Sequence, residues 1–191
     1  MTDKAHPPSV NNAAALFDEM LVVLVQKGDS HAGERLFQRW NRRLIRAARR
    51  YCGSEDGAHD LAQDCWVAIW KGLGTLRDPA RFRSYAFAVL HRRGASRLRD
   101  VIREREAAPD PLETALPASQ SESAAITQAF TALPPDQRLA AHLHFVEGLT
   151  LREIAEVQSI AEGTAKSRLF HARRKLKAAL DPSPQSQGEL Q

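Results

Sequence analysis

Residues 163–176 read GTAKSRLFHARRKL, and this stretch decides how the C-terminal part of the chain folds. Its apolar residues step by four, three and four, which predicts the buried face of an α-helix. That face consists of Ala165, Leu169, Ala172 and Leu176. The outward face is predicted to carry Lys166, Ser167, Phe170, His171, Arg173 and Arg174. By itself, this spacing suits a solvated amphipathic helix as well as a helix that lies against DNA.

A second helix is predicted directly before this one. TLRE at 150–153 has the pattern of a capping box, in which Thr150 accepts from the amide of Glu153 and Glu153 reaches back. A short helix to about residue 158, a turn over 159–161 and a longer helix over 162–180 follow. This order is typical of a helix-turn-helix, whose second helix enters the major groove of DNA. The capped first helix and an outward Phe170 therefore favour DNA binding over a solvated helix.

The rest of the chain predicts an all-α fold. Apolar residues recur at three- and four-residue steps from about residue 16 to 105, with breaks at 28–30, 53–57 and a proline-containing loop at 76–82. In 59–73 the buried stripe is predicted to be Leu61, Cys65, Ile69 and Leu73. A helix opened by Pro134 and Pro135 is predicted to bury Leu139, Leu143 and Val146. No strand pattern and no internal repeat is visible.

A change in composition at 106–124 divides these helices into two groups. This segment holds three prolines, four acidic residues and no Lys or Arg, which is typical of a flexible linker. We therefore expect two small helical domains joined by an acidic linker. The predicted boundaries are a disordered N-terminus over 1–15, a domain over 16–105, the linker over 106–124, a second domain over 125–180 and a flexible tail over 181–191.

The composition limits the possible classes of protein. A formal net charge of +4 over 191 residues suits a polyanionic partner. No apolar stretch approaches the roughly 20 residues that span a bilayer, so we expect a cytoplasmic protein. Cys52 and Cys65, with His59 between them, fit no zinc pattern, so no metal is expected. A redox-sensing role for either thiol remains open.

A second basic concentration lies at 77–105. Its arginines are Arg77, Arg81, Arg83, Arg92, Arg93, Arg97, Arg99, Arg103 and Arg105. Phe82, Tyr85 and Phe87 are interleaved with them. Arginines that follow a backbone and rings that stack on bases suit single-stranded nucleic acid, although any one of these rings could instead be core.

No active site is apparent. Asp60 and Asp64 lie one helical turn apart, but no nucleophile or ligand set accompanies them. His142 and His144 would face different sides of a helix, so they are poor joint ligands. We therefore expect no catalytic residues, no cofactor and no small-molecule substrate.

Two motifs in the correct order resemble the sigma-70 family of bacterial RNA polymerase initiation factors, specifically its extracytoplasmic-function (ECF) group. HDLAQDCWVAIWKGL at 59–73 is similar to the region 2 signature D-L-x-Q-E/D-x-F/W-x-x-x-W. The landmarks of region 4 correspond to LPPDQR at 133–138, EIA at 153–155 and GTAKSRLFHAR at 163–173. The resemblance covers about 16–105 and 125–180.

The resemblance implies binding partners and site residues. The largest-subunit clamp helices of core RNA polymerase would be bound by Asp60, Gln63, Asp64 and Trp70. The minus-10 element of promoter DNA would be recognised and melted by Arg77, Arg81, Phe82, Arg83, Tyr85, Arg92 and Arg93. The minus-35 element would be read by Thr164, Lys166, Ser167, Arg168, Phe170, His171 and Arg174. The linker would occupy the path of the RNA, and an anti-sigma factor would be a further partner.

The sequence departs from the family pattern at several positions. YAFAVLHR at 85–92 stands where many members have W-L-x-x-I-A-x-N, so Tyr85 and Arg92 alter the expected pocket for a flipped base. In the turn before the last helix, Ser159 replaces a common glycine and Ala161 a common capping serine, a loss of roughly 1 kcal/mol. His171 replaces an arginine and would make a weaker, pH-dependent phosphate contact.

Three alternatives to a sigma factor remain open from the sequence. The first is a helix-turn-helix regulator that never joins polymerase. The second is a nucleic-acid-processing enzyme, for which no catalytic set is visible. The third is a sigma-like competitor that binds polymerase without initiating transcription, an alternative supported by Arg92 and Ala161.

Overall fold

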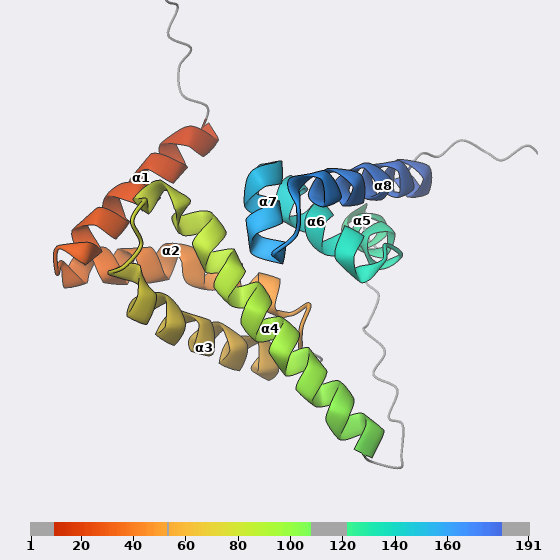
Figure 1. Cartoon of the computed structure of the whole chain (residues 1–191), viewed down its shortest axis with the longest axis horizontal. Helices are drawn as coiled ribbons and strands as arrows, with labels where there is room; N and C mark the ends of the chain where they lie inside the picture. Colours follow the sequence, from red (N-terminus) through yellow and green to blue (C-terminus); the bar gives the residue numbers. More distant parts are fainter. Residues whose placement is uncertain (1–9, 53, 108–121, 181–191) are drawn as a thin grey trace, which may run out of the picture. The chain divides into compact units, whose positions relative to one another are not determined.

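The computed structural model describes residues 10–52, 54–107 and 122–180 of the chain. These residues form eight α-helices and one 3₁₀ turn, with no strand among them, so the all-α prediction is confirmed. The chain divides into two compact units, residues 1–114 and 115–191. Each unit is described by itself (Figure 1). No helix in the described part of the chain is long and apolar enough to cross a membrane.

The first unit is a four-helix arrangement with a short turn before its last helix. Its elements are α1 (Val10–Gln26), α2 (Ser30–Ala48), α3 (Glu55–Leu73), η1 (Pro79–Arg81) and α4 (Phe82–Ala107). Side-chain caps fix three of the helix starts, because carboxylate or hydroxyl oxygens accept from otherwise unpaired amides. Asp29 accepts from Ala32, Ser54 from Gly57 and Asp78 from Ala80.

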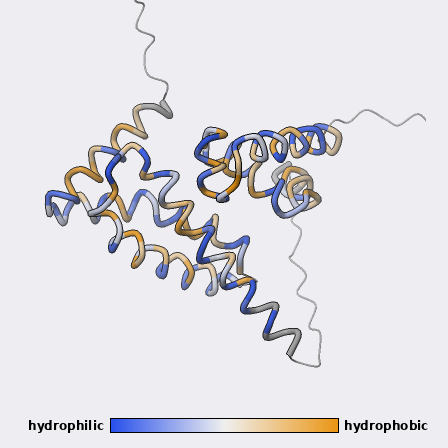
Figure 2. The backbone as a smooth tube through the Cα atoms, in the orientation of Figure 1, coloured by the Kyte–Doolittle hydropathy of each residue, from blue (hydrophilic) through white to orange (hydrophobic). Residues whose placement is uncertain are grey.

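The core of the first unit forms around Trp40 of α2, which is 1% exposed. The Phe82 ring meets the Trp40 ring edge-on at 5.0 Å, and the Phe87 ring lies at 6.0 Å. The predicted stripe of α3 is buried as expected, since Leu61, Cys65, Ile69 and Leu73 are each at most 2% exposed. Figure 2 shows the matching division of α3 into hydrophobic and hydrophilic positions.

The predicted disordered segment 1–15 was wrong for residues 10–15, because α1 begins at Val10. The alanines at 13–15 have the highest intrinsic helix propensity, and the helix that they extend packs against α2. Residues 1–9, most of the predicted linker (108–121) and the predicted tail over 181–191 lie outside the described residues.

The second unit consists of α5 (Glu122–Thr131), α6 (Pro135–Phe145), α7 (Leu151–Gln158) and α8 (Glu162–Leu180). The predicted inner face of α8 is confirmed: Ala165, Leu169, Ala172 and Leu176 are all buried. Ala172 and Leu176 pack with Ala129, Leu133 and Ala141 of the preceding elements. The burial predicted for Val146 was wrong, because α6 ends at Phe145 and Val146 is 48% exposed.

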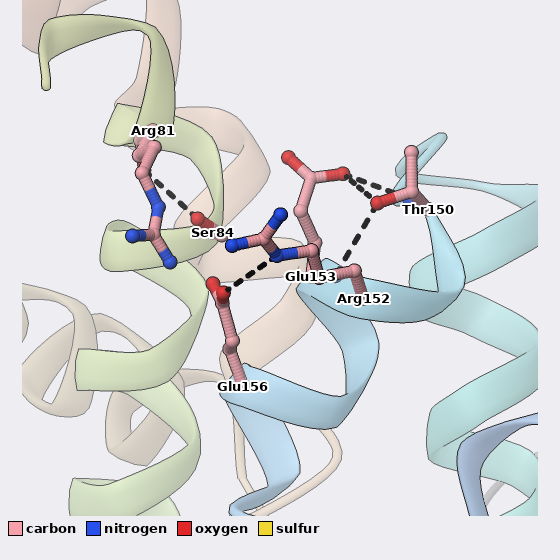
Figure 3. Close-up of polar contacts among 6 residues, drawn as sticks. All are labelled: Arg81, Ser84, Thr150, Arg152, Glu153 and Glu156. Carbon is pink, nitrogen blue, oxygen red and sulfur yellow. Dashed lines mark hydrogen bonds and ion pairs between the residues drawn. The ribbon is translucent and has the colours of Figure 1, made fainter. Parts of the chain in front are cut away.

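Hydrogen bonds and backbone conformation define α7 and the turn that joins it to α8. The capping box at the start of α7 is confirmed: the Glu153 amide donates to Thr150 Oγ1 at 3.3 Å, and the Thr150 amide donates to Glu153 Oε2 at 2.8 Å (Figure 3). At its end, Ser159 adopts the left-handed conformation, with φ of 54°. Ala161 starts α8 without a side-chain acceptor, and its carbonyl accepts from the amides of Thr164 and Ala165.

Candidate functional site

The outer face of α3 brings together the residues predicted to bind polymerase. Asp60, Gln63 and Asp64 are exposed and lie within one turn of one another. Trp70 is 38% exposed about two turns further along the same side. Sequence reasoning missed Val67, which lies between them on this face and is 51% exposed. The α3 face therefore combines carboxylates with apolar side chains, and the exposed i+3 and i+4 spacing around Asp64 could have revealed Val67.

An aromatic ladder holds Trp70 in place. Its ring stacks on Trp66 at 5.1 Å, and the Trp66 ring meets Phe37 of α2 at 5.0 Å. The Trp66 indole nitrogen donates to Asn41 Oδ1 at 3.2 Å. These contacts orient the exposed Trp70 ring before any partner arrives.

The predicted minus-10 residues in the loop at 76–82 and at the start of α4 differ in their exposure. Arg77 and Arg81 are exposed and Arg83 is half-buried. The Ser84 hydroxyl donates to the carbonyl of Arg81 at 3.0 Å, which closes the turn into α4 (Figure 3). Phe82 is only 1% exposed, so its predicted contact with DNA is not supported: the ring completes the core against Trp40.

Tyr85 is half-buried between α4 and α3. Its hydroxyl donates to the carbonyl of Ala68 at 3.4 Å. Burial raises the pKa of the Tyr85 phenol, and the Arg92 guanidinium partly offsets that shift. Arg92 and Arg93 are exposed further along α4. The N-terminal half of α4 thus carries one partly exposed aromatic ring and several arginines.

One ion pair joins α3 to α4. Arg97 Nη2 lies 4.0 Å from Asp60 Oδ2, and the Asp60 side chain remains 68% exposed. A pair this long and solvated is weak, so Asp60 stays available to a partner.

Most of the predicted minus-35 residues line the exposed side of α8. Phe170 is 62% exposed and its ring meets that of His171 at 5.5 Å. The other exposed members of the predicted set are Thr164, Lys166, Ser167 and Arg174.

Arg168 is the exception on α8. Its side chain is 24% exposed, and it donates to Asp136 Oδ2 at 2.6 Å and to Gln158 Oε1 at 2.5 Å. These contacts join α8 to α6 and α7. The prediction that Arg168 reads DNA is therefore not supported by its position, which gives the guanidinium a role inside the fold.

The two histidines of α6 have separate structural partners. The His142 ring nitrogen Nε2 lies 3.2 Å from Glu147 Oε1, and both residues are buried. His144 Nδ1 lies 3.0 Å from the carbonyl oxygen of Leu149. Within the described residues, no group of three His, Cys, Asp or Glu side chains could hold a metal ion.

The cysteines are free thiols, of which Cys65 is buried and Cys52 is half-buried. Burial raises the pKa of Cys65 to about 12 and also raises the pKa of Cys52, against the opposing effect of Arg97. The Cys52 thiol donates to the carbonyl of Gly57 at 3.2 Å. Thiols in this state are poor nucleophiles, which disfavours the redox role left open by the sequence.

Comparison with known proteins matches the two units to two regions of one family. Residues 36–104 match the model of sigma-70 region 2, and residues 123–176 match that of sigma-70 region 4. The ECF RNA polymerase sigma factor SigM of Mycobacterium tuberculosis is 33% identical over 165 residues, which cover 83% of this chain and 82% of that protein. The RNA polymerase sigma-H factor of Pseudomonas aeruginosa is 28% identical, with 86% and 94% of the two chains covered.

A solved structure shows the same fold at similar coverage. The chain of CnrH in its complex with the cytosolic domain of CnrY superposes with a TM-score of 0.61 at 28% identity, covering 87% of this chain and 99% of that one. A helical region 2 and a helix-turn-helix region 4 define the class of protein as a sigma factor. The chain belongs to the ECF group of the sigma-70 family and acts as an RNA polymerase sigma factor in transcription initiation.

Proposed function

We propose that the α3 face docks on the clamp helices of the largest subunit of core polymerase. The observation that carries this proposal is the composition of the face: Asp60, Gln63 and Asp64 lie beside the exposed Val67, and Trp70 follows one turn later. Exposed apolar side chains next to polar ones are typical of protein–protein interfaces. A simple helix-turn-helix repressor that never joins polymerase has no need of a polymerase-binding face on its first unit.

The promoter contacts belong to two further surfaces. The melted minus-10 strand would be bound by Arg77, Arg81, Tyr85, Arg92 and Arg93, because arginines follow a nucleic-acid backbone and an aromatic ring stacks on unpaired bases. The minus-35 duplex would be read by α8 through Thr164, Lys166, Ser167, Phe170, His171 and Arg174, which a major groove can accommodate. The chain itself would catalyse nothing, since the chemistry of RNA synthesis belongs to core polymerase.

Two further parts of the proposal concern regulation and location. An anti-sigma factor would hold the protein inactive, by analogy with CnrH, whose structure was solved with the cytosolic domain of CnrY. The exposed apolar side chains of the α3 face would be covered in such a complex. The place of action would be the cytoplasm, where core polymerase and promoter DNA meet.

Run-off transcription with purified core polymerase tests this function. We expect transcripts that start at defined sites with a shared pair of upstream elements. Asp64→Arg should abolish binding to core, because it reverses a charge at the centre of the α3 face. The matched control is Glu34→Arg, an equal reversal at an exposed position of α2. Binding of the wild type without defined starts would identify a competitor, and no binding would refute the sigma mechanism.

A further inference from the structure

A row of arginines runs along α2 outside all the surfaces described so far. Residues 35, 39, 42, 46 and 49 are all arginine and step by four, three, four and three. Residues at these steps share one face of an α-helix, and 14 residues rise about 21 Å. These five arginines, called the α2 arginine face below, therefore form a straight row of positive charge.

Two of the five arginines, Arg39 and Arg49, form ion pairs with carboxylates. Arg39 pairs with Asp18 at 2.8 Å and lies over the Phe17 ring at 4.8 Å. Arg49 pairs with Glu55. The other three, Arg35, Arg42 and Arg46, are exposed, and none has an ion-pair partner within the described part of the chain. Three uncompensated guanidinium groups on one line create a local field that attracts a polyanion.

The composition of the α2 arginine face favours a nucleic acid over a protein as its partner. The one large exposed apolar side chain of α2 is Phe37, which lies on the flank of the helix against Trp66. The α3 face, in contrast, contains Val67 and Trp70. Protein–protein interfaces have an apolar centre that is poor in charge, whereas protein–DNA interfaces are polar and strongly positive. The α2 arginine face has the second composition.

We infer that Arg35, Arg42 and Arg46 bind the phosphate backbone of promoter DNA. This inference rests on the proposed function and adds a third DNA contact, distinct from the minus-10 loop and from α8. Guanidinium groups match phosphate geometry with two parallel hydrogen bonds. The contact reads no base, so it contributes affinity at every promoter that the protein uses and leaves the sequence preference to the other two surfaces.

The test compares holoenzymes formed with the wild type, with the triple variant Arg35→Gln, Arg42→Gln, Arg46→Gln, and with the matching triple lysine variant. The dissociation constant for a promoter fragment is measured from 50 to 200 mM salt. Loss of three phosphate contacts lowers the salt slope by about 2.7, so the wild type should lose about 40-fold more affinity than the glutamine variant over this range. The lysine variant should keep most of the wild-type slope, because it retains the charge.

Two controls make the outcome decisive. Circular dichroism must show that both triple variants unfold at the wild-type temperature, and binding to core must be unchanged. A wild type that initiates transcription, together with an unaltered salt slope in the glutamine variant, would overturn the inference and leave the proposed function intact. Loss of anti-sigma binding at an unaltered slope would assign the α2 arginine face to a protein partner instead. Failure of the wild type to bind core would refute the proposed function itself.

Discussion

The Tyr85 hydroxyl lies directly above Gly72, at 2.2 Å from the point where a Cβ atom of that residue would stand. No larger residue fits there unless Tyr85 moves, because the hydroxyl oxygen would overlap the added carbon. Gly72 is on α3, next to the proposed polymerase face, and Tyr85 is on α4, next to the proposed minus-10 surface. The contact makes the position of one proposed surface depend on the backbone of the other.

Gly72→Ala should displace the Tyr85 ring and weaken promoter opening. The overlap should cost about 1–3 kcal/mol, partly offset by the higher helix propensity of alanine. Permanganate reactivity of the melted strand measures opening, and urea unfolding measures stability. Gly74→Ala is the control, because nothing lies within 4 Å of a Cβ at that position and its φ is −62°. Equal promoter opening by the two variants would mean that the contact between Tyr85 and Gly72 does not affect opening.

Ser159→Gly should stabilise the second unit. Ser159 has φ of 54°, a conformation that costs a non-glycine residue about 1–2 kcal/mol. Glycine avoids this cost but loses more conformational entropy on folding, so part of the gain is cancelled. We expect a net gain of about 0.5–1 kcal/mol in urea unfolding of the full chain. Ser159→Ala keeps the Cβ and should show no gain. A gain of equal size in the alanine variant would place the effect in the hydroxyl and not in the backbone.

Cys65 should resist alkylation in the folded protein. With a pKa of about 12, only about one thiol in ten thousand is ionised at pH 8, and the thiolate is the reactive species. Cys52 is less buried and should react faster than Cys65 but more slowly than a free cysteine. Iodoacetamide labelling followed by mass spectrometry measures both rates, with urea-unfolded protein as the reference. Rapid native labelling of Cys52 would restore the redox hypothesis.

Arg168→Ala should lower stability, because it breaks the contacts with Asp136 and Gln158 and leaves the oxygen of the buried Gln158 without its donor. We expect a loss of about 1–3 kcal/mol in urea unfolding. The salt slope of promoter binding, measured below the unfolding transition, should stay near that of the wild type. A lower slope with unchanged stability would return Arg168 to the DNA-reading set.

Lys166→Ala should have the opposite effects to Arg168→Ala, because it should weaken promoter binding and leave stability nearly unchanged. Lys166 is exposed on α8 and its removal should leave stability within about 0.5 kcal/mol of the wild type. Promoter affinity should fall and the salt slope should decrease by about one, which corresponds to one lost phosphate contact. An unchanged slope would exclude that contact.

Helical periodicity predicted the features that depend on spacing within one element. The inner face of α8 follows from steps of three and four, and the capping box of α7 from the residues at 150 and 153. Both are local, so the sequence contains all that determines them. Val146 shows the limit of this reasoning: its spacing suits the buried stripe, but α6 ends one residue earlier.

Features that depend on contacts between elements could not be predicted in this way. Phe82 has the residue type of a base-stacking ring, and its burial follows from Trp40 on another helix. Arg168 looks like a DNA contact in its own helix, and its partners lie 10 and 32 residues away. Val67 was overlooked because an apolar residue in a helix is usually assigned to the core, whereas here it is exposed beside Asp64.

The guanidinium of Arg168 also limits how this protein can be re-engineered. A graft of α8 alone from another sigma factor, made to change promoter choice, would carry its own residue into the space between Asp136 and Gln158. Where that residue is not arginine, the buried Gln158 oxygen would lose its donor and the transplanted helix would pack less tightly against α6 and α7. A working chimera must therefore keep arginine at 168 or exchange α6, α7 and α8 as a single cassette.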